Sequence, residues 1–171
     1  MAGRAQVSGA GSSPLQTTEH NLLIIEGRFY DDIGNALIAG AEAECQATGT
    51  TFERIAVPGA LEIPQVLAQA IATGKVGRGA TVPNYSGVVA LGCIIRGETY
   101  HFDIVCDNAN HWLMELATRY AIPVGNGILT VDTREQALTR ARGGREGKGA
   151  DAVRACLRLC DISLDFGKRD L

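Results

Sequence analysis

One apolar segment constrains the fold of this chain more than any other. Residues 87–95 read GVVALGCII, so apolar or small side chains fill consecutive positions instead of alternate ones. That pattern is typical of a central strand in a parallel sheet, because helices cover both faces of such a strand. The segment therefore predicts a sheet with helices on two sides.

Short strand-like runs and helical patterns alternate along the chain. The predicted strands are residues 22–26, 51–57, 87–95 and 123–131. The predicted helices are residues 33–47, 61–72, 100–120, 133–142 and 150–164. The helix at 100–120 is expected to carry one apolar stripe: Val105, Ala109, Trp112, Leu113, Leu116 and Tyr120. Residues 75–84, rich in Gly and Pro, are predicted as an exposed loop. Strands that alternate with helices favour right-handed crossovers and a mostly parallel sheet. We therefore predict an α/β protein, a three-layer α/β/α sandwich built on a four-stranded sheet.

Length and charge limit the organisation and the partners of the chain. Its 171 residues suit one globular domain, and we expect a flexible N-terminal segment at 1–19 before a single domain at 20–171. The net charge of −3 offers no general basic surface to nucleic acid. No apolar run approaches the roughly 20 residues that span a bilayer, and no signal-peptide centre is present. We expect a cytoplasmic protein that binds neither nucleic acid nor membranes.

The cysteines and histidines predict neither a disulfide framework nor a metal site. All five cysteines lie inside apolar segments, as expected of reduced, buried thiols: Cys45, Cys93, Cys106, Cys156 and Cys160. His101 and His111 are ten residues apart, and no HExxH or CxxC pair occurs. We therefore expect no metal in this protein.

The turn after residue 95 is a candidate anion site. Gly97, Glu98 and Thr99 lead into a predicted helix, whose first N–H groups lack internal acceptors and lie at the positive helix end. The alternative is an ordinary helix cap by Thr99. Because the carboxylate of Glu98 would repel a phosphate unless it points away, the backbone and a nearby cation would have to bind it.

His101 follows in the first helical turn. The helix dipole disfavours its protonated form there, so the neutral ring can accept a proton as a general base. A hydrogen-bonded structural histidine is the alternative.

Other turns after strands carry further candidates, since ligands bind beyond the carboxyl ends of parallel strands. Glu62 can accept hydrogen bonds from a heterocycle or cap a helix. Phe29 can stack on a flat ligand or simply pack. A cluster of cations surrounds the glycines of GGREGKG, either as solvated surface or as phosphate ligands: Arg140, Arg142, Arg145 and Lys148.

Taken together, these motifs resemble the lumazine synthase family. GRFY, VPGALEIP, ALGCIIRGETYHFDIV, GNGILTV and RARGGREGKG occur in the family's order over about residues 20–163. The resemblance implies a flavodoxin-like sheet and a transferase of riboflavin biosynthesis that requires no cofactor. Its substrates would be 5-amino-6-(D-ribitylamino)uracil and 3,4-dihydroxy-2-butanone 4-phosphate, and its products 6,7-dimethyl-8-ribityllumazine, phosphate and water.

The resemblance also implies a role for each matching residue. Phe29 would stack on the pyrimidine, and six residues would line the rest of its pocket: Ala60, Leu61, Glu62, Cys93, Ile94 and Ile95. Arg140 and the backbone of Glu98 and Thr99 would hold the phosphate, and Lys148 falls at a basic position near it. His101 would shuttle protons.

Assembly enters through the same resemblance, because the family forms pentamers with sites between neighbouring subunits. Asn126 and Arg140 would come from the neighbour. Some relatives form decamers or sixty-subunit shells, but RGGREG stands here where shells carry a GTKAGN-like segment, which favours a pentamer. Asn126 and Leu61 also stand where many relatives are aromatic, so substrate affinity is expected to change more than reaction type.

Two other functions remain open at this point. A binding or scaffold protein could keep flavin-like ligands in a weakened pocket while another enzyme makes the product. A flavodoxin-like electron carrier with flavin mononucleotide is disfavoured, because GRFYDD follows the first strand in place of a Ser/Thr-rich phosphate loop.

Overall fold

Four parallel strands form the middle layer of the computed structural model, which describes residues 20–77 and 85–169. They are β1 (Asn21–Gly27), β2 (Thr51–Val57), β3 (Gly87–Ile95) and β4 (Val124–Val131), in the sheet order β2-β1-β3-β4. Every neighbouring pair is parallel. The prediction of a four-stranded, mostly parallel sheet is confirmed.

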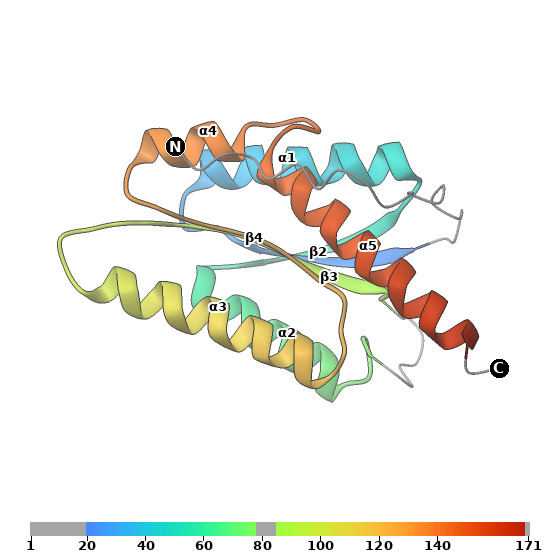
Figure 1. The fold of residues 1–171 in the computed structure, drawn as a ribbon. Helices are drawn as coiled ribbons and strands as arrows, with labels where there is room; N and C mark the ends of the chain where they lie inside the picture. Colours follow the sequence, from blue (N-terminus) through green and yellow to red (C-terminus); the bar gives the residue numbers. More distant parts are fainter. Residues whose placement is uncertain (1–19, 78–84, 170–171) are drawn as a thin grey trace.

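Helices cover both faces of this sheet (Figure 1). On one face lie α1 (Asp31–Thr48), α4 (Arg134–Ala141) and α5 (Lys148–Arg169). On the other lie α2 (Ile63–Ala72) and α3 (His101–Arg119). The result is the expected three-layer α/β/α sandwich.

Strand β3 shows why the apolar run was informative. Its alternate side chains enter two cores: Val89 and Leu91 pack with α1 and α5, whereas Val88 and Ala90 pack with α2 and α3. Residues 87–94 are all buried. The strand is therefore central, with both faces covered, as predicted.

Some helix boundaries differ from the predicted ones. A short 3-10 turn at Ala60–Glu62 precedes α2, and Pro64 lies in the first turn of that helix, where its missing N–H costs nothing. Helix α5 begins at Lys148, inside the segment predicted as a loop. A Cβ on Gly149 would lie 1.8 Å from the Leu37 carbonyl oxygen, so glycine lets α5 begin directly against α1.

The predicted apolar stripe of α3 was too wide. Ala109 and Leu113 are buried, but Trp112 is 49% exposed and Tyr120 is 44% exposed. The buried stripe continues through Ala117, at intervals of four residues, and Trp112 lies about 100° around the helix from Leu113. The inclusion of Trp112 and Tyr120 in the apolar stripe that packs on the sheet is therefore wrong.

The cysteines are free thiols, and four of the five are buried as predicted, whereas Cys106 is only half-buried. No helix in the described part of the chain is long and apolar enough to cross a membrane. The predicted flexible segment 1–19 and most of the predicted loop 75–84 lie outside the described residues. That residues 20–171 form one domain stays a prediction.

Candidate functional site

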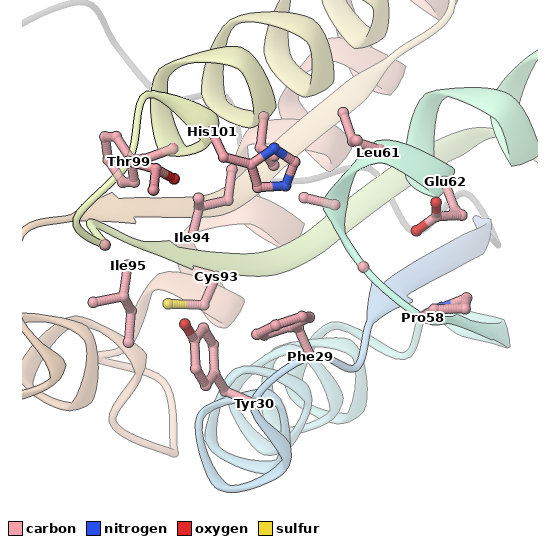
Figure 2. A pocket seen from close by; sticks show the side chains of 15 residues that line it. Phe29, Tyr30, Pro58, Leu61, Glu62, Cys93, Ile94, Ile95, Thr99 and His101 are labelled. Atoms are coloured by element: carbon pink, nitrogen blue, oxygen red, sulfur yellow. The ribbon is translucent and has the colours of Figure 1, made fainter.

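A cavity of about 380 Å³ lies beyond the carboxyl ends of β1, β2 and β3 (Figure 2). Nine of the residues predicted for the site line it: Phe29, Ala60, Leu61, Glu62, Cys93, Ile94, Ile95, Thr99 and His101. They come from the turns after three strands, the end of β3 and the start of α3. The fold thus gathers in one place segments that are up to 72 positions apart in the sequence.

The turn after β1 supplies an aromatic wall. The ring of Phe29 is 70% exposed and meets Tyr30 edge to face, with ring centroids 4.9 Å apart. Figure 2 shows both rings on the opposite side of the cavity from His101. A flat ligand between these sides can stack on Phe29.

Arg28 fixes the shape of that turn. Its guanidinium donates to the buried carboxylate of Glu26 at 3.3 Å, and to Asp31 and Asn35 at 2.9 Å each. Its backbone N–H donates to the Val57 carbonyl at 2.8 Å, which ties the turn to the end of β2. The aromatic wall is therefore held by both side-chain and backbone bonds.

The turn after β2 supplies the wall that carries a carboxylate. Glu62 stands at the start of α2 but makes no side-chain cap. Among the described residues, no side chain donates a hydrogen bond to its carboxylate, which lines the cavity beside Leu61 and Pro58 (Figure 2). The helix-cap alternative is wrong, and the carboxylate is available to accept hydrogen bonds from a ligand.

The end of β3 forms an apolar wall from Cys93, Ile94 and Ile95. Burial raises the pKa of the Cys93 thiol to about 11. The thiol is therefore protonated at neutral pH, and the thiolate that a nucleophile requires is scarce. Cys93 is suited to contact with a ligand rather than to covalent chemistry.

The turn before α3 leaves backbone donors open. The helix begins at His101 with Tyr100 as its N-cap, which makes no side-chain cap bond, so the prediction of a Thr99 cap is wrong. Within the described chain, the N–H groups of Gly97, Glu98 and Thr99 have no hydrogen-bond acceptor. An anion can satisfy them at the positive end of α3.

His101 lines the cavity at the same helix end. No described side chain makes a hydrogen bond or ion pair with its ring, so nothing supports the alternative of a hydrogen-bonded structural histidine. The ring faces the space above Phe29 (Figure 2). It can exchange a proton with a ligand in the cavity.

Local charge at this turn does not favour an anion. Arg96 follows β3 directly, but its guanidinium binds Asp132 at 3.0 Å and Asp103 at 3.4 Å and lies 4.1 Å from the centroid of the Phe102 ring. Glu98 adds a further exposed carboxylate and does not line the cavity. A phosphate at this turn therefore needs a cation from elsewhere.

Arg140 differs from the other three cations of the predicted cluster. Each of those three has a carboxylate partner: Arg142 with Glu146, Arg145 with Glu44, and Lys148 with Asp151. Arg140 bonds only the Gln136 carbonyl of its own helix, at 3.1 Å, and no carboxylate in the described chain pairs with it. Among the four cations of this cluster, the guanidinium of Arg140 is therefore the one most available to an external anion.

Four predicted site residues do not line this cavity: Glu98, Asn126, Arg140 and Lys148. Asn126 is exposed on β4, where its amide donates to Asn110 at 2.8 Å and its oxygen accepts from the Ile128 N–H at 2.9 Å. Arg140 belongs to α4, on the face of the sheet opposite α3 (Figure 1). Glu98 lies in the turn before His101 with its side chain outside the cavity, whereas one chain alone does not bring Asn126, Arg140 or Lys148 into the cavity.

The structure places Gly97 of the predicted anion turn in the lining and adds five residues that the site prediction omitted: Tyr30, Pro58, Gly59, Phe102 and Val105. The signal that could have found them is proximity in sequence. Most adjoin a predicted residue, and Val105 lies one helical turn after His101. In the described part of the chain, no group of three His, Cys, Asp or Glu side chains is placed to hold a metal ion.

Comparison with known proteins gives the same family throughout. Residues 19–163 match the model of the 6,7-dimethyl-8-ribityllumazine synthase family. A protein of that name from Agrobacterium fabrum is 47% identical over 147 residues, 86% of this chain and 97% of that protein. Another from Azorhizobium caulinodans is 50% identical over 142 residues, 83% of this chain and 85% of that protein. This chain belongs to the 6,7-dimethyl-8-ribityllumazine synthase family.

Proposed function

We propose that this chain catalyses the reaction for which its family is named. It condenses 5-amino-6-(D-ribitylamino)uracil with 3,4-dihydroxy-2-butanone 4-phosphate, and it releases phosphate and water, in riboflavin biosynthesis. The observation that carries this proposal is the cavity itself, because it combines an aromatic face, an unbonded carboxylate and a histidine at an open helix end. These are the groups that a heterocycle and a proton-transfer reaction require.

The pyrimidine occupies the aromatic part of the cavity. Phe29 stacks on its ring, while Glu62 accepts hydrogen bonds from its N–H or ribityl O–H groups. Ala60, Leu61 and the residues 93–95 complete the pocket. The exposure of the Phe29 ring and the absence of a described partner for Glu62 support this assignment.

The phosphate of the second substrate binds the turn before α3. The N–H groups of Glu98 and Thr99 donate to it, while the Glu98 side chain stays outside the cavity. Arg140 supplies the balancing cation from a neighbouring subunit, and Lys148 adds a further positive charge nearby. The ion pairs of Arg96 support this division, because they leave the turn without a free cation of its own.

His101 moves protons during the condensation. Attack of the amine on the ketone, loss of water to form the imine, elimination of phosphate, and ring closure with loss of a second water all require proton transfers. The ring of His101 lines the cavity and has no hydrogen-bond partner among the described side chains, so it is placed to accept a proton from a bound substrate and return it. General acid–base catalysis of this kind contributes about 10²–10⁴-fold.

Most of the acceleration comes from holding the two substrates together. Well-oriented reactants gain on the order of 7–11 kcal/mol from proximity. The proposed steps exchange no electrons with an external group, so the reaction needs no cofactor. A cavity whose aromatic wall is fixed by Arg28 before substrate arrives suits this role.

The active form is a homopentamer in which each site lies between two subunits, with Asn126 and Arg140 contributed by the neighbour. Two exposed aromatic side chains in the turns around the cavity support an interface there: Phe29, 70% exposed, and Tyr100, 71% exposed. Sedimentation should give five times the 18.1 kDa of one chain. A cytoplasmic location stays a prediction.

The proposed activity is tested by mixing the purified protein with both substrates. We expect the fluorescence of the lumazine to rise together with an equal amount of free phosphate. No product at saturating substrate would overturn the proposal. Tight riboflavin binding without turnover would instead favour the binding role.

A further inference from the structure

A buried carboxylate outside the cavity has no part in the proposed chemistry. Glu44 lies in α1, where it is 2% exposed, beside the fully buried Ala41 and Cys45. An ionised side chain in such a place is costly unless hydrogen bonds and opposite charges compensate. The hydrogen-bond partners of Glu44 therefore indicate which part of the structure it stabilises.

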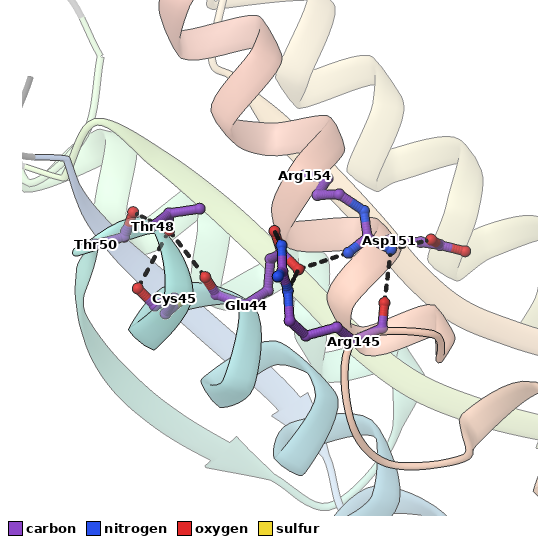
Figure 3. Close-up of polar contacts among 7 residues, drawn as sticks. All are labelled: Glu44, Cys45, Thr48, Thr50, Arg145, Asp151 and Arg154. Carbon is purple, nitrogen blue, oxygen red and sulfur yellow. Dashed lines mark hydrogen bonds and ion pairs between the residues drawn. The ribbon is translucent and has the colours of Figure 1, made fainter. Parts of the chain in front are cut away.

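Two arginines from a distant part of the chain reach Glu44 (Figure 3). Arg145 donates from Nε to Oε2 at 2.9 Å and from Nη2 to Oε1 at 3.2 Å. Arg154 donates from Nη1 to Oε2 at 2.6 Å. The hydrogen bond from Arg145 lowers the pKa of Glu44 despite its burial, so the carboxylate is charged at neutral pH.

The contacts continue from Glu44 to the start of α5. Arg154 also donates to the Arg145 carbonyl at 3.0 Å and to Asp151 at 2.6 Å. The other oxygen of Asp151 pairs with the Lys148 ammonium at 3.2 Å. Glu44 is thus linked to Arg145, inside the segment 142–147 that joins α4 to α5, and through Arg154 and Asp151 to the start of α5. The segment also closes on itself, because a Cβ on Gly147 would lie 1.8 Å from the Arg142 carbonyl oxygen.

Close backbone contacts also join the segment 142–147 and the start of α5 to α1. A Cβ on Gly40, one turn before Glu44, would lie 3.1 Å from the Gly144 carbonyl oxygen. A Cβ on Gly149 would lie 1.8 Å from the Leu37 carbonyl oxygen. The segment at Gly144 and the start of α5 at Gly149 both rest on α1, and the arginine pairs of Glu44 keep them there.

We propose that Glu44 is a positioning residue for phosphate binding, because it fixes the segment 142–147 and so the placement of Arg140 before it and Lys148 after it. This inference rests on the proposed function, in which Arg140 serves the site of a neighbouring subunit and Lys148 adds positive charge near that site. Glu44 itself touches no substrate. Its loss misplaces the cations while the cavity stays intact.

The substitution Glu44→Gln tests this inference in the assembled enzyme. The neutral amide keeps the size of the side chain but loses the charge that holds two guanidinium groups. We expect the KM for the butanone phosphate to rise on the order of tenfold, since small displacements of binding groups are costly. The KM for the pyrimidine and kcat at saturation should stay near wild-type values.

Glu42→Gln is the matched control, because Glu42 lies in the same helix and also binds an arginine, Arg54, at 2.9 Å, but on the exposed surface. It should leave all three constants unchanged. If Glu44→Gln does not fold, Arg145→Gln replaces it, and Arg145→Lys should recover part of the affinity. Normal affinity for the butanone phosphate in an assembled Glu44→Gln or Arg145→Gln protein, or an equal rise of both KM values, would overturn the inference.

Hydrogen exchange separates this inference from the proposed function. Amides in the segment 142–147 should exchange faster in Glu44→Gln than in wild type or Glu42→Gln, whether or not the enzyme turns over. Unchanged exchange would refute the positioning role. Faster exchange in a protein whose wild type makes no lumazine would refute the proposed function alone.

Discussion

The two halves of the candidate site are built in different ways. The pyrimidine half is a cavity of one chain, whose aromatic wall is fixed by Arg28 and whose carboxylate, Glu62, has no described donor. The phosphate half has open N–H groups in this chain but no free cation beside them. Arg140 is the one cation around GGREGKG that no described carboxylate pairs with, and it lies in α4, on the face of the sheet opposite α3. From the proposed function we therefore expect that recognition of the pyrimidine is local, whereas compensation of the phosphate charge depends on assembly.

Removing the imidazole of His101, which lies between the two halves of the site, should have the largest effect on catalysis. His101→Ala is expected to lower kcat by about 10²–10⁴-fold, because the proton shuttle is lost. Both KM values should change little, since the ring contributes to proton transfer more than to binding. Steady-state kinetics on each substrate measures this split, with His111→Ala as the control. A His101→Ala enzyme with normal kcat would remove His101 from the mechanism.

Removing the cation of the phosphate half should have the second-largest effect. Arg140→Ala should raise the KM for the butanone phosphate more than tenfold, because a charge-assisted hydrogen bond contributes roughly 1.5–3 kcal/mol. The pyrimidine KM and the sedimentation behaviour should stay unchanged. Arg158→Ala, at an exposed arginine of α5, is the control. Unaltered kinetics in Arg140→Ala would exclude Arg140 from the site.

Weakening the pyrimidine half should raise the KM for the pyrimidine instead of the KM for the butanone phosphate, and by a smaller factor. Phe29→Leu keeps an apolar side chain but removes the ring face, and aromatic pairing contributes about 0.5–1.5 kcal/mol. The KM for the pyrimidine should therefore rise roughly two- to tenfold, with the other KM unchanged. Phe166→Leu removes an exposed ring of α5 as a control. An effect confined to the butanone phosphate would contradict the assignment of the two halves.

The smallest effect is expected at the thiol of the pyrimidine half. Cys93→Ala removes one lining atom, so kcat/KM should fall by less than about fivefold. Because the pKa of Cys93 is about 11, the thiol stays protonated as pH rises from 6 to 9, and wild type and variant should share one pH profile over that range. A loss of a hundredfold or more would instead indicate a nucleophile.

Two buried glutamates in the described part of the chain, Glu26 and Glu44, show which features of the structure could be predicted from the sequence and which could not. Glu26 binds Arg28, two residues later in the GRFY motif that also carried the family resemblance, so part of the aromatic turn is encoded locally. Its second partner, Arg54, lies 28 residues away on β2. The strands, the cavity walls and His101 were predictable for the same reason, because each lies at a local strand-to-turn boundary.

Glu44 could not be recognised in that way. Its partners Arg145 and Arg154 lie 101 and 110 residues away, and nothing local distinguishes their charges from a solvated surface. The sequence predicted a cation cluster, but only the structure separates the paired Arg145 and Lys148 from the unpaired Arg140. Long-range ion pairs depend on tertiary structure, which periodicity does not encode.

The central claim is that one subunit supplies the cavity and another supplies Arg140. The most direct test mixes His101→Ala and Arg140→Ala chains, unfolds them and allows them to assemble together. In a ring of head-to-tail contacts, roughly a quarter of the sites then combine an intact cavity with an intact arginine. We predict that the mixture recovers this share of wild-type activity at limiting butanone phosphate. Activity no higher than the mean of the two separate variants would contradict the claim.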